Sequence, residues 1–359
     1  MGRPAVGVCG ALVALFLVDA ALFRTGLYPA MLDPESTAGR VEMMRYVEMR
    51  RARSKAAQAI AFGDSRMGFL PGVATAATVG RDVEFTSVAV PGTSPRSWYY
   101  QLRDLDPDAR RYAAIILPVD DYDDEDRAED PADSVVDMNY AIARLRLADL
   151  IDFTRSFPAW RERWVVLRGL VIKGTVYKDD LQGFLLAPDA RRRKVRLFHD
   201  DSANWYRNFE ADSRDVQGLS VDWSNWTLTP PPGATPAQEK VLRDVLLRRA
   251  VPQTGRLAEY RRQWFGRIID RYRGGATRVF IFRLPRGPVP RPEWLVHRRS
   301  SSIREMAARP NVVLLDERCF EPLERPSLFM DPLHMNRKGM DEFSRMLGEA
   351  VAGRLSHAF

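Results

Sequence analysis

Three residues of this 359-residue chain have side chains that together could carry out acyl-ester chemistry: Ser65, Asp331 and His334. A serine hydroxyl is a weak nucleophile until a neighbouring base accepts its proton. A carboxylate on the far ring nitrogen of a histidine fixes its tautomer and stabilises its charged form. Because Asp331 and His334 are three residues apart, both can stand on one loop. The sequence therefore predicts a catalytic triad of Ser65, His334 and Asp331.

The tetrahedral intermediate of such a reaction needs hydrogen-bond donors for its oxyanion. The backbone N–H groups of Ser65 and Gly92 are the candidates. Asp120 and Asp121 follow the third apolar run of the chain and are candidates for a third oxyanion position or for the rim of the site. Since an ionised carboxylate repels an oxyanion, we expect both aspartates to face solvent or to bind other partners. The simpler alternatives are a helix-capping role for Ser65 and a turn role for Gly92.

No motif indicates a metal ion or an organic cofactor, so we expect neither. The acidic run at positions 120–126 invites a calcium interpretation, but it lacks the glycine and the distal glutamate of an EF-hand loop. A solvated loop at the rim of the site is the better interpretation.

Five apolar runs of strand length are bounded by Pro, Gly or charged residues. They span residues 57–62, 83–90, 113–119, 278–284 and 311–315, and helical patterns span 95–103, 255–272, 292–308 and 336–355. This alternation predicts a three-layer α/β/α sandwich around a parallel sheet, with the flavodoxin-like strand order 2-1-3-4-5. Ligands of such sheets bind beyond the carboxyl ends of the strands, where Ser65, Gly92 and Asp120 fall.

The third and fourth runs are separated by roughly 150 residues, far more than one crossover needs. We expect residues 122–270 to form a mainly helical insertion or cap between two parts of one domain, 57–121 and 271–359, after a stalk and leading helix at 27–56. The insertion contains an amphipathic stretch at 135–153 and the tryptophans Trp160, Trp164, Trp205, Trp223 and Trp226. Their aromatic faces could stack on sugar rings, although core packing is the commoner use of tryptophan.

Residues 4–23 form an apolar run that only Asp19 interrupts, and its length suits a bilayer crossing. We expect residues 1–26 to be a retained single-pass transmembrane anchor in the cytoplasmic membrane, with the large domain outside. Cleavage as a signal peptide is the alternative. The net charge of +7 comes from arginines scattered among acidic residues. Without a nucleic-acid motif, this pattern argues against nucleic acid as a partner.

The candidate residues lie in motifs that resemble those of the SGNH/GDSL hydrolases. Residues 61–67, Ala-Phe-Gly-Asp-Ser-Arg-Met, resemble the nucleophile block, Gly92 matches the glycine block, and residues 331–339 resemble the terminal block. The resemblance covers residues 57–121 and 277–356. It departs where the family carries an oxyanion asparagine, since this chain has Leu-Pro-Val-Asp-Asp at 117–121. That departure and the apolar N-terminal run resemble the membrane-anchored SGNH-like partners of membrane-bound O-acyltransferases.

This resemblance implies transfer of an acyl group, in the first place acetyl, to or from hydroxyls of a periplasmic or extracellular glycan, through an acyl-Ser65 intermediate. It also implies a multi-span O-acyltransferase as a partner. Two alternatives stay open: a membrane-anchored esterase or deacetylase that uses water, and a non-catalytic SGNH-like partner of a membrane acyltransferase.

Overall fold

The computed structural model of the chain describes residues 3–52, 54–124, 136–200, 213–249, 256–296 and 300–355. Contacts divide the chain into two compact units. Unit 1 combines Met1–Arg51, Gly92–Leu105 and Pro131–Ser202, and unit 2 combines Ala52–Pro91, Asp106–Asp130 and Ala203–Phe359. The residues expected to form the insertion are shared between the two units, and Gly92–Leu105, expected within the domain part 57–121, belongs to unit 1.

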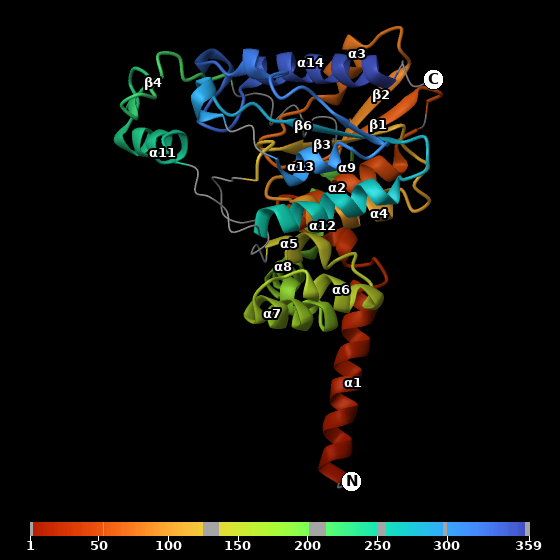
Figure 1. The fold of residues 1–359 in the computed structure, drawn as a ribbon. Coiled ribbons are helices and arrows are strands. Elements are labelled where there is room, and N and C mark those ends of the chain that lie inside the picture. The colour runs from red at the N-terminus through yellow and green to blue at the C-terminus, as the bar shows by residue number, and fades with distance from the viewer. Residues whose placement is uncertain are drawn as a thin grey trace. The chain divides into compact units, whose positions relative to one another are not determined.

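Unit 2 is built on a parallel five-stranded sheet (Figure 1). Its strands are β1 (Ala57–Ala61), β2 (Val83–Ser87), β3 (Ala114–Val119), β6 (Arg278–Arg283) and β7 (Val312–Leu314). They follow the order β2-β1-β3-β6-β7, and every neighbouring pair is parallel. The predicted α/β class and the predicted order 2-1-3-4-5 are therefore confirmed.

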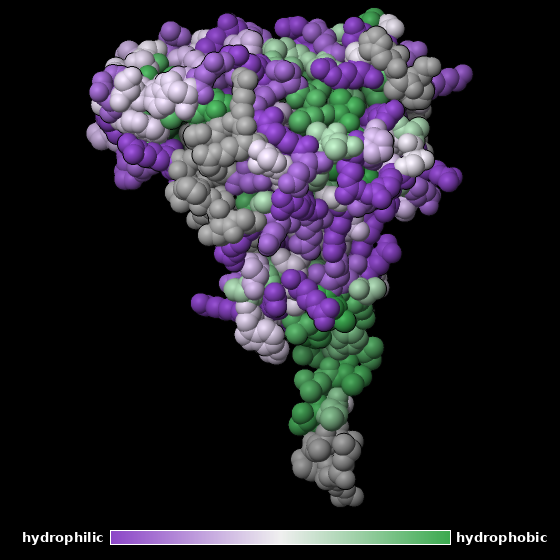
Figure 2. Space-filling view, in the orientation of Figure 1, coloured by the Kyte–Doolittle hydropathy of each residue, from purple (hydrophilic) through white to green (hydrophobic). Residues whose placement is uncertain are grey.

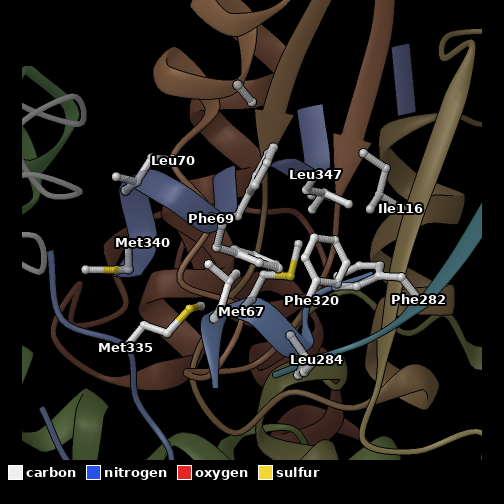
Figure 3. Packing of buried hydrophobic residues seen from close by; sticks show 14 of the residues in the cluster. Met67, Phe69, Leu70, Ile116, Phe282, Leu284, Phe320, Met335, Met340 and Leu347 are labelled. Atoms are coloured by element: carbon white, nitrogen blue, oxygen red, sulfur yellow. The ribbon is translucent and has the colours of Figure 1, made fainter. Parts of the chain in front are cut away.

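The core of unit 2 lies on the face of the sheet that α14 (Arg337–Leu355) and α3 (Pro71–Ala77) cover. Alternate strand residues, such as Ile116 and Phe282, point into it and meet Phe320 and Leu347 (Figure 3). The helix α12 (Arg256–Arg271) runs on the other side of the sheet (Figure 1). Apolar strand residues are thus buried on both faces, which explains why the strands read as continuous apolar runs.

One predicted helix and one amphipathic stretch are broken in the structure. Residues 292–308 contain a short 3-10 helix, η4 (Glu293–Leu295), and a separate α13 (Ser302–Met306). The Ser301 side chain accepts a hydrogen bond from the backbone of Arg304 and so starts a new helix. Within the amphipathic stretch at 135–153, the described residues likewise form short pieces, α5 (Val136–Ala141), η3 (Leu147–Asp149) and the start of α6 (Leu150–Arg155). The single helix predicted over 292–308 is wrong for this reason.

The part of the insertion that belongs to unit 2 carries a small antiparallel hairpin, β4 (Ser220–Asp222) and β5 (Thr227–Thr229). The helix α11 (Pro236–Leu246) follows it. A capping box starts this helix, since Thr235 and Gln238 exchange hydrogen bonds. These two hydrogen bonds satisfy two backbone N–H groups at the N-terminus of the helix.

Unit 1 is helical. It contains α1 (Arg3–Phe23), η1 (Pro29–Met31), α2 (Thr37–Arg50), α4 (Pro95–Leu105), α5, η3, α6, α7 (Trp160–Val171), α8 (Gly174–Leu186) and α9 (Pro188–Asp200). Tyr28, Leu32 and Met44 are buried, so the segment expected to be a stalk is packed. Among the residues whose placement is described, no helix is both long and apolar enough to cross a membrane.

Asp19, the acidic residue in the apolar run, has a structural partner within unit 1. Its two carboxylate oxygens accept hydrogen bonds from the backbone amides of Lys173 (3.1 Å) and Gly174 (2.6 Å). These amides stand at the start of α8, where a negative charge is favoured by unpaired N–H groups and the helix dipole. The C-terminal end of α1 is therefore tied to the N-terminus of α8.

A matched pair of glycine substitutions tests the packing of α14. A Cβ at Gly339 would lie 2.2 Å from the carbonyl oxygen of Leu328, so Gly339→Ala should lower the free energy of unfolding by about 2 kcal/mol or more. A Cβ at Gly266 in α12 would meet nothing within 4 Å, so Gly266→Ala should raise it by about 0.5–1 kcal/mol. Urea unfolding followed by circular dichroism measures the free energy of unfolding of both variants. Changes of the same sign would contradict the close contact between position 339 and the carbonyl of Leu328.

Candidate active site

Ser65 stands on a tight turn beyond the carboxyl end of β1. The strand direction continues through Phe62, whose N–H donates to the carbonyl of Ile116 at 3.0 Å. The Asp64 side chain then accepts the backbone N–H of Arg66 at 2.8 Å. A Cβ at Gly63 would lie 2.7 Å from the Cβ of Met67, so only glycine fits the turn without displacement. The sequence placed Ser65 correctly at this edge of the sheet.

The loop before α14 brings Asp331 and His334 together. One carboxylate oxygen of Asp331 accepts the backbone N–H groups of Leu333 and His334, each at 2.7 Å. The other oxygen lies 2.7 Å from Nδ1 of His334, and Nε2 lies 2.9 Å from Oγ of Ser65. The predicted hydrogen-bonded chain of Ser65, His334 and Asp331 is present. With the proton on Nδ1, Nε2 is free to accept the serine proton.

The carboxyl of Asp331 keeps its charge near neutral pH. Burial alone would raise its pKa, but the hydrogen bonds from the His334 ring and from the amides of Leu333 and His334 lower the pKa below its ordinary value. An ionised Asp331 can hold the Nδ1 proton and stabilise the imidazolium when His334 takes the serine proton.

Asn336 fixes the end of this loop to α14. Its backbone N–H donates to Leu328 at 2.9 Å, and its side-chain amide donates to Ser327 at 3.0 Å. Its side-chain oxygen accepts the N–H of Gly339 at 3.0 Å, which caps α14. Met335 on the same segment is buried and belongs to the same hydrophobic cluster as Met67 from the turn of Ser65 (Figure 3). Both loops that carry the triad are therefore seated in the same core.

Asp120 pairs with Arg66, the residue that follows the candidate nucleophile. The Arg66 guanidinium lies 2.7 Å from Asp120 and 2.7 Å from Asp64, so one cation is shared by two carboxylates. Burial alone would raise the pKa of Asp64, but the charge and hydrogen bonds of Arg66 hold it below its ordinary value. Sequence reasoning did not single out Arg66 or Asp64, although both belong to the nucleophile motif.

Asp121 is held by Arg286, with 3.2 Å between the Arg286 Nε and the carboxylate. It also accepts the backbone N–H of Tyr122 at 2.8 Å. Burial alone would raise the pKa of Asp121, but Arg286 and this amide lower it. Both aspartates thus bind other partners, as expected, and neither is an uncompensated charge in the site.

The backbone N–H of Ser65 is available to an oxyanion, because it donates no hydrogen bond within the described part of the chain. Gly92 is the first residue of a segment of unit 1 and has φ +77°, a conformation that glycine adopts readily. Its part in an oxyanion hole stays a prediction, as do the chemical roles of the triad.

A cavity of about 430 Å³ opens at Ser65 and His334 within unit 2. The lining that the structure describes contains four arginines, five aspartates and several apolar side chains: Arg66, Arg248, Arg286, Arg291, Asp64, Asp120, Asp121, Asp123, Asp244, Val245, Leu246, Leu284, Val289, Leu295 and Leu333. Trp223 also lines it and donates from Nε1 to the carbonyl of Pro290 at 3.0 Å. The cavity can thus accept a ligand with both apolar and polar groups.

The other tryptophans of the insertion have different places. Trp226 packs edge-on against Trp223, at 5.9 Å between ring centroids. Trp160 and Trp164 belong to unit 1, and Trp205 lies outside the described residues. Among the described tryptophans of the insertion, Trp223 alone lines the cavity, so structural support for a sugar-stacking role is limited to that residue.

Within the described residues, no group of three or more His, Cys, Asp or Glu side chains is placed to hold a metal ion. Glu125 and Asp126, the end of the acidic run, lie outside those residues.

Comparison with known proteins gives no assignment. No protein-family model matches the sequence, and no curated protein is significantly similar to it. The interpretation of the site therefore depends on its geometry.

Labelling with a fluorophosphonate tests whether His334 activates Ser65. The reagent should modify Ser65 in the wild type and fail with His334→Ala, because the hydroxyl then lacks the base that lies 2.9 Å away. His199→Ala is the control, since His199 stacks on Tyr46 in unit 1. Peptide mass spectrometry identifies the modified residue. Equal labelling of wild type and His334→Ala would show that His334 does not activate the serine.

The charge pairing at Arg66 predicts a pH-dependent change in stability. The lowered pKa of Asp64 contributes stability that is present above the ordinary Asp pKa of about 3.9 and is lost as pH falls through the lower folded-state value. Arg66→Gln should therefore destabilise the protein more at neutral pH than in acid. Arg325→Gln, which breaks an exposed pair with Glu342, should cost little at any pH. Thermal unfolding between acid and neutral pH measures both, and a pH-independent loss for Arg66→Gln would contradict the pairing.

Proposed function

We propose that this chain is an SGNH-type serine acyltransferase that moves an acyl group, in the first place acetyl, to hydroxyls of an extracytoplasmic glycan. The observation that carries the proposal is the hydrogen-bonded chain from Ser65 Oγ through His334 to Asp331. These three hydrogen-bonded side chains lie beyond the carboxyl end of β1, in a parallel sheet of flavodoxin-like order. Such folds bind their ligands at this edge of the sheet.

The geometry suits a two-step reaction through an acyl-serine. His334 Nε2 accepts the Ser65 proton while Oγ attacks the acyl carbonyl of an ester, and Asp331 stabilises the imidazolium. The Ser65 amide, with Gly92 as the expected second donor, binds the oxyanion. Collapse returns the proton to the leaving alcohol. An acceptor hydroxyl then attacks the acyl-Ser65 while His334 takes its proton. The bond between the acyl carbon and Ser65 Oγ breaks, His334 returns the proton to Oγ, and the acyl group stays on the acceptor oxygen.

The cavity supports substrates of this kind. Leu284 and Leu333 line it together with Ser65 and offer apolar surface to an acyl group. Trp223 offers an aromatic ring on which a sugar could stack. Arg248 is an exposed part of the lining and could bind an anionic group of a glycan or acyl donor.

A membrane-anchored esterase or deacetylase is the second candidate. It would use the same triad with water as acceptor, and the many charged side chains around the cavity favour it, because they retain water near the acyl-serine. A non-catalytic role as the partner of a membrane acyltransferase would not explain the hydrogen-bonded geometry of the triad.

Although no described helix meets the length and apolarity of a membrane span, we further propose that α1 inserts into the cytoplasmic membrane as a single-pass anchor, with unit 2 outside the cell or in the periplasm. Val8, Leu12, Val13 and Leu15 are between 54% and 61% exposed. Side chains of this kind are costly to leave in water and stable in hydrocarbon. A multi-span O-acyltransferase in the same membrane would be a suitable source of acyl groups.

Acyl transfer can be tested with the purified full chain, an activated acetyl ester and an oligosaccharide acceptor. The wild type should form acetyl-Ser65 and acetylated oligosaccharide, both detected by mass spectrometry, and Ser65→Ala should reduce turnover by at least about 10³-fold. The exposed Ser224→Ala is the matched control. An acetyl-Ser65 that releases only free acetate would favour the esterase. No acetyl-Ser65 in the wild type would contradict both enzymatic assignments.

A further inference from the structure

The helix α7 in unit 1 exposes large apolar side chains that no described part of the chain covers. Trp160 is 76% exposed and Trp164 is 58% exposed. Together with Arg168 and Val171, which are also exposed, they recur every three or four residues and so share one side of the helix. We call these four residues the α7 stripe. The opposite side of α7 is packed, since Val166 and Leu170 are buried.

The α7 stripe ends close to the point where α1 leaves the rest of unit 1. The Arg24 guanidinium, directly after α1, donates to the carbonyls of Leu170 at 2.7 Å and Val171 at 3.0 Å. It thereby caps the C-terminus of α7. Asp19 meanwhile ties α1 to the start of α8. Two independent polar contacts thus join the base of α1 to α7 and α8.

Figure 1 shows α6 and α7 on the side of unit 1 from which α1 projects. In Figure 2, the hydrophobic surface of α1 continues up to these helices. The helix α6 packs against α7, and its residue Ile151 is also 60% exposed. A bilayer that holds α1 would therefore lie next to α7.

The composition of the α7 stripe suits the headgroup region of a bilayer. Tryptophan concentrates at membrane–water interfaces, because its ring is apolar and its N–H needs a polar partner. The exposed Arg155, Arg161 and Arg168 add positive charge, which anionic headgroups attract. The same charge disfavours packing of this basic surface against a second copy of itself.

We propose that the α7 stripe docks on the headgroup region of the membrane that holds α1, with a preference for anionic lipid. This inference rests on the proposed insertion of α1. The docking gives the chain a second membrane contact, so that unit 1 is held against the bilayer and does not swing freely on α1.

Site-specific fluorescence on the full chain tests the docking. In a Cys9→Ser, Cys319→Ser background, a polarity-sensitive dye is attached to one of three single cysteines: Arg168→Cys on the stripe, Leu15→Cys on α1, or Arg192→Cys on α9 as control. The Arg192 side chain is 60% exposed, and α9 packs against α8, α2 and η1. Vesicles of phosphatidylcholine, with or without phosphatidylglycerol, carry lipid quenchers either near the headgroup or at the end of the acyl chain.

We expect the dye at position 15 to shift to the blue and to be quenched by the deep quencher. The dye at 168 should be quenched by the shallow quencher, more strongly with phosphatidylglycerol, and the dye at 192 should not change. Trp160→Ser combined with Trp164→Ser should reduce the shallow quenching at 168 by about half or more. Both tryptophans are exposed, so this variant should stay folded, which circular dichroism checks.

The outcomes separate this inference from the insertion of α1. An unquenched dye at 168 beside a lipid-buried dye at 15 would overturn the docking and leave the insertion intact. Unquenched dyes at both positions would contradict the insertion itself. A blue shift at 168 that needs no vesicles and grows with protein concentration would indicate contact between two copies of the chain and would also overturn the docking.

Discussion

The candidate site depends on the Asp331 carboxylate, because each of its two oxygens has a different task. One oxygen binds the amides of Leu333 and His334 and so shapes the loop, while the other holds Nδ1 of His334. The ring orientation is therefore set by the same group that folds the backbone around it. Loss of the carboxylate would remove the partner of the imidazole and the turn that aims it at Ser65.

The sequence predicted the sheet and the triad because both leave local signals. Buried parallel strands appear as short apolar runs, and the chemical types and spacing of Ser65, Asp331 and His334 are recognisable without a structure. The division into two units was not predictable, because it depends on distant pairs such as Arg144 with Glu42, 2.8 Å apart, which no local pattern reveals. The break in 292–308 was missed for a related reason, since the cap at Ser301 interrupts a stretch whose apolar spacing is helical.

The arginines explain how acidic residues occupy a position where the resembled family has an asparagine. Asp120 is paired with Arg66, and Asp121 with Arg286. Arg66 itself follows Ser65 and is oriented by Asp64 on the same turn. The nucleophile turn therefore supplies its own cation to the neighbouring loop. Arg66 could have been found from the sequence, because the predicted strand order places the loop after β1, which carries Arg66, next to the loop after β3, which carries Asp120.

The bond between Asp19 and α8 also bears on proteolytic maturation. A peptidase that cut the chain after Ala20 would separate the Asp19 carboxylate from the amides of Lys173 and Gly174. The first turn of α8 would then lose its negative partner. Phe23, 2% exposed and stacked on Tyr177 at 5.7 Å between ring centroids, would be left near a newly formed chain end. The apolar N-terminal segment thus contributes to the tertiary structure of unit 1, and its removal would have a cost in folding.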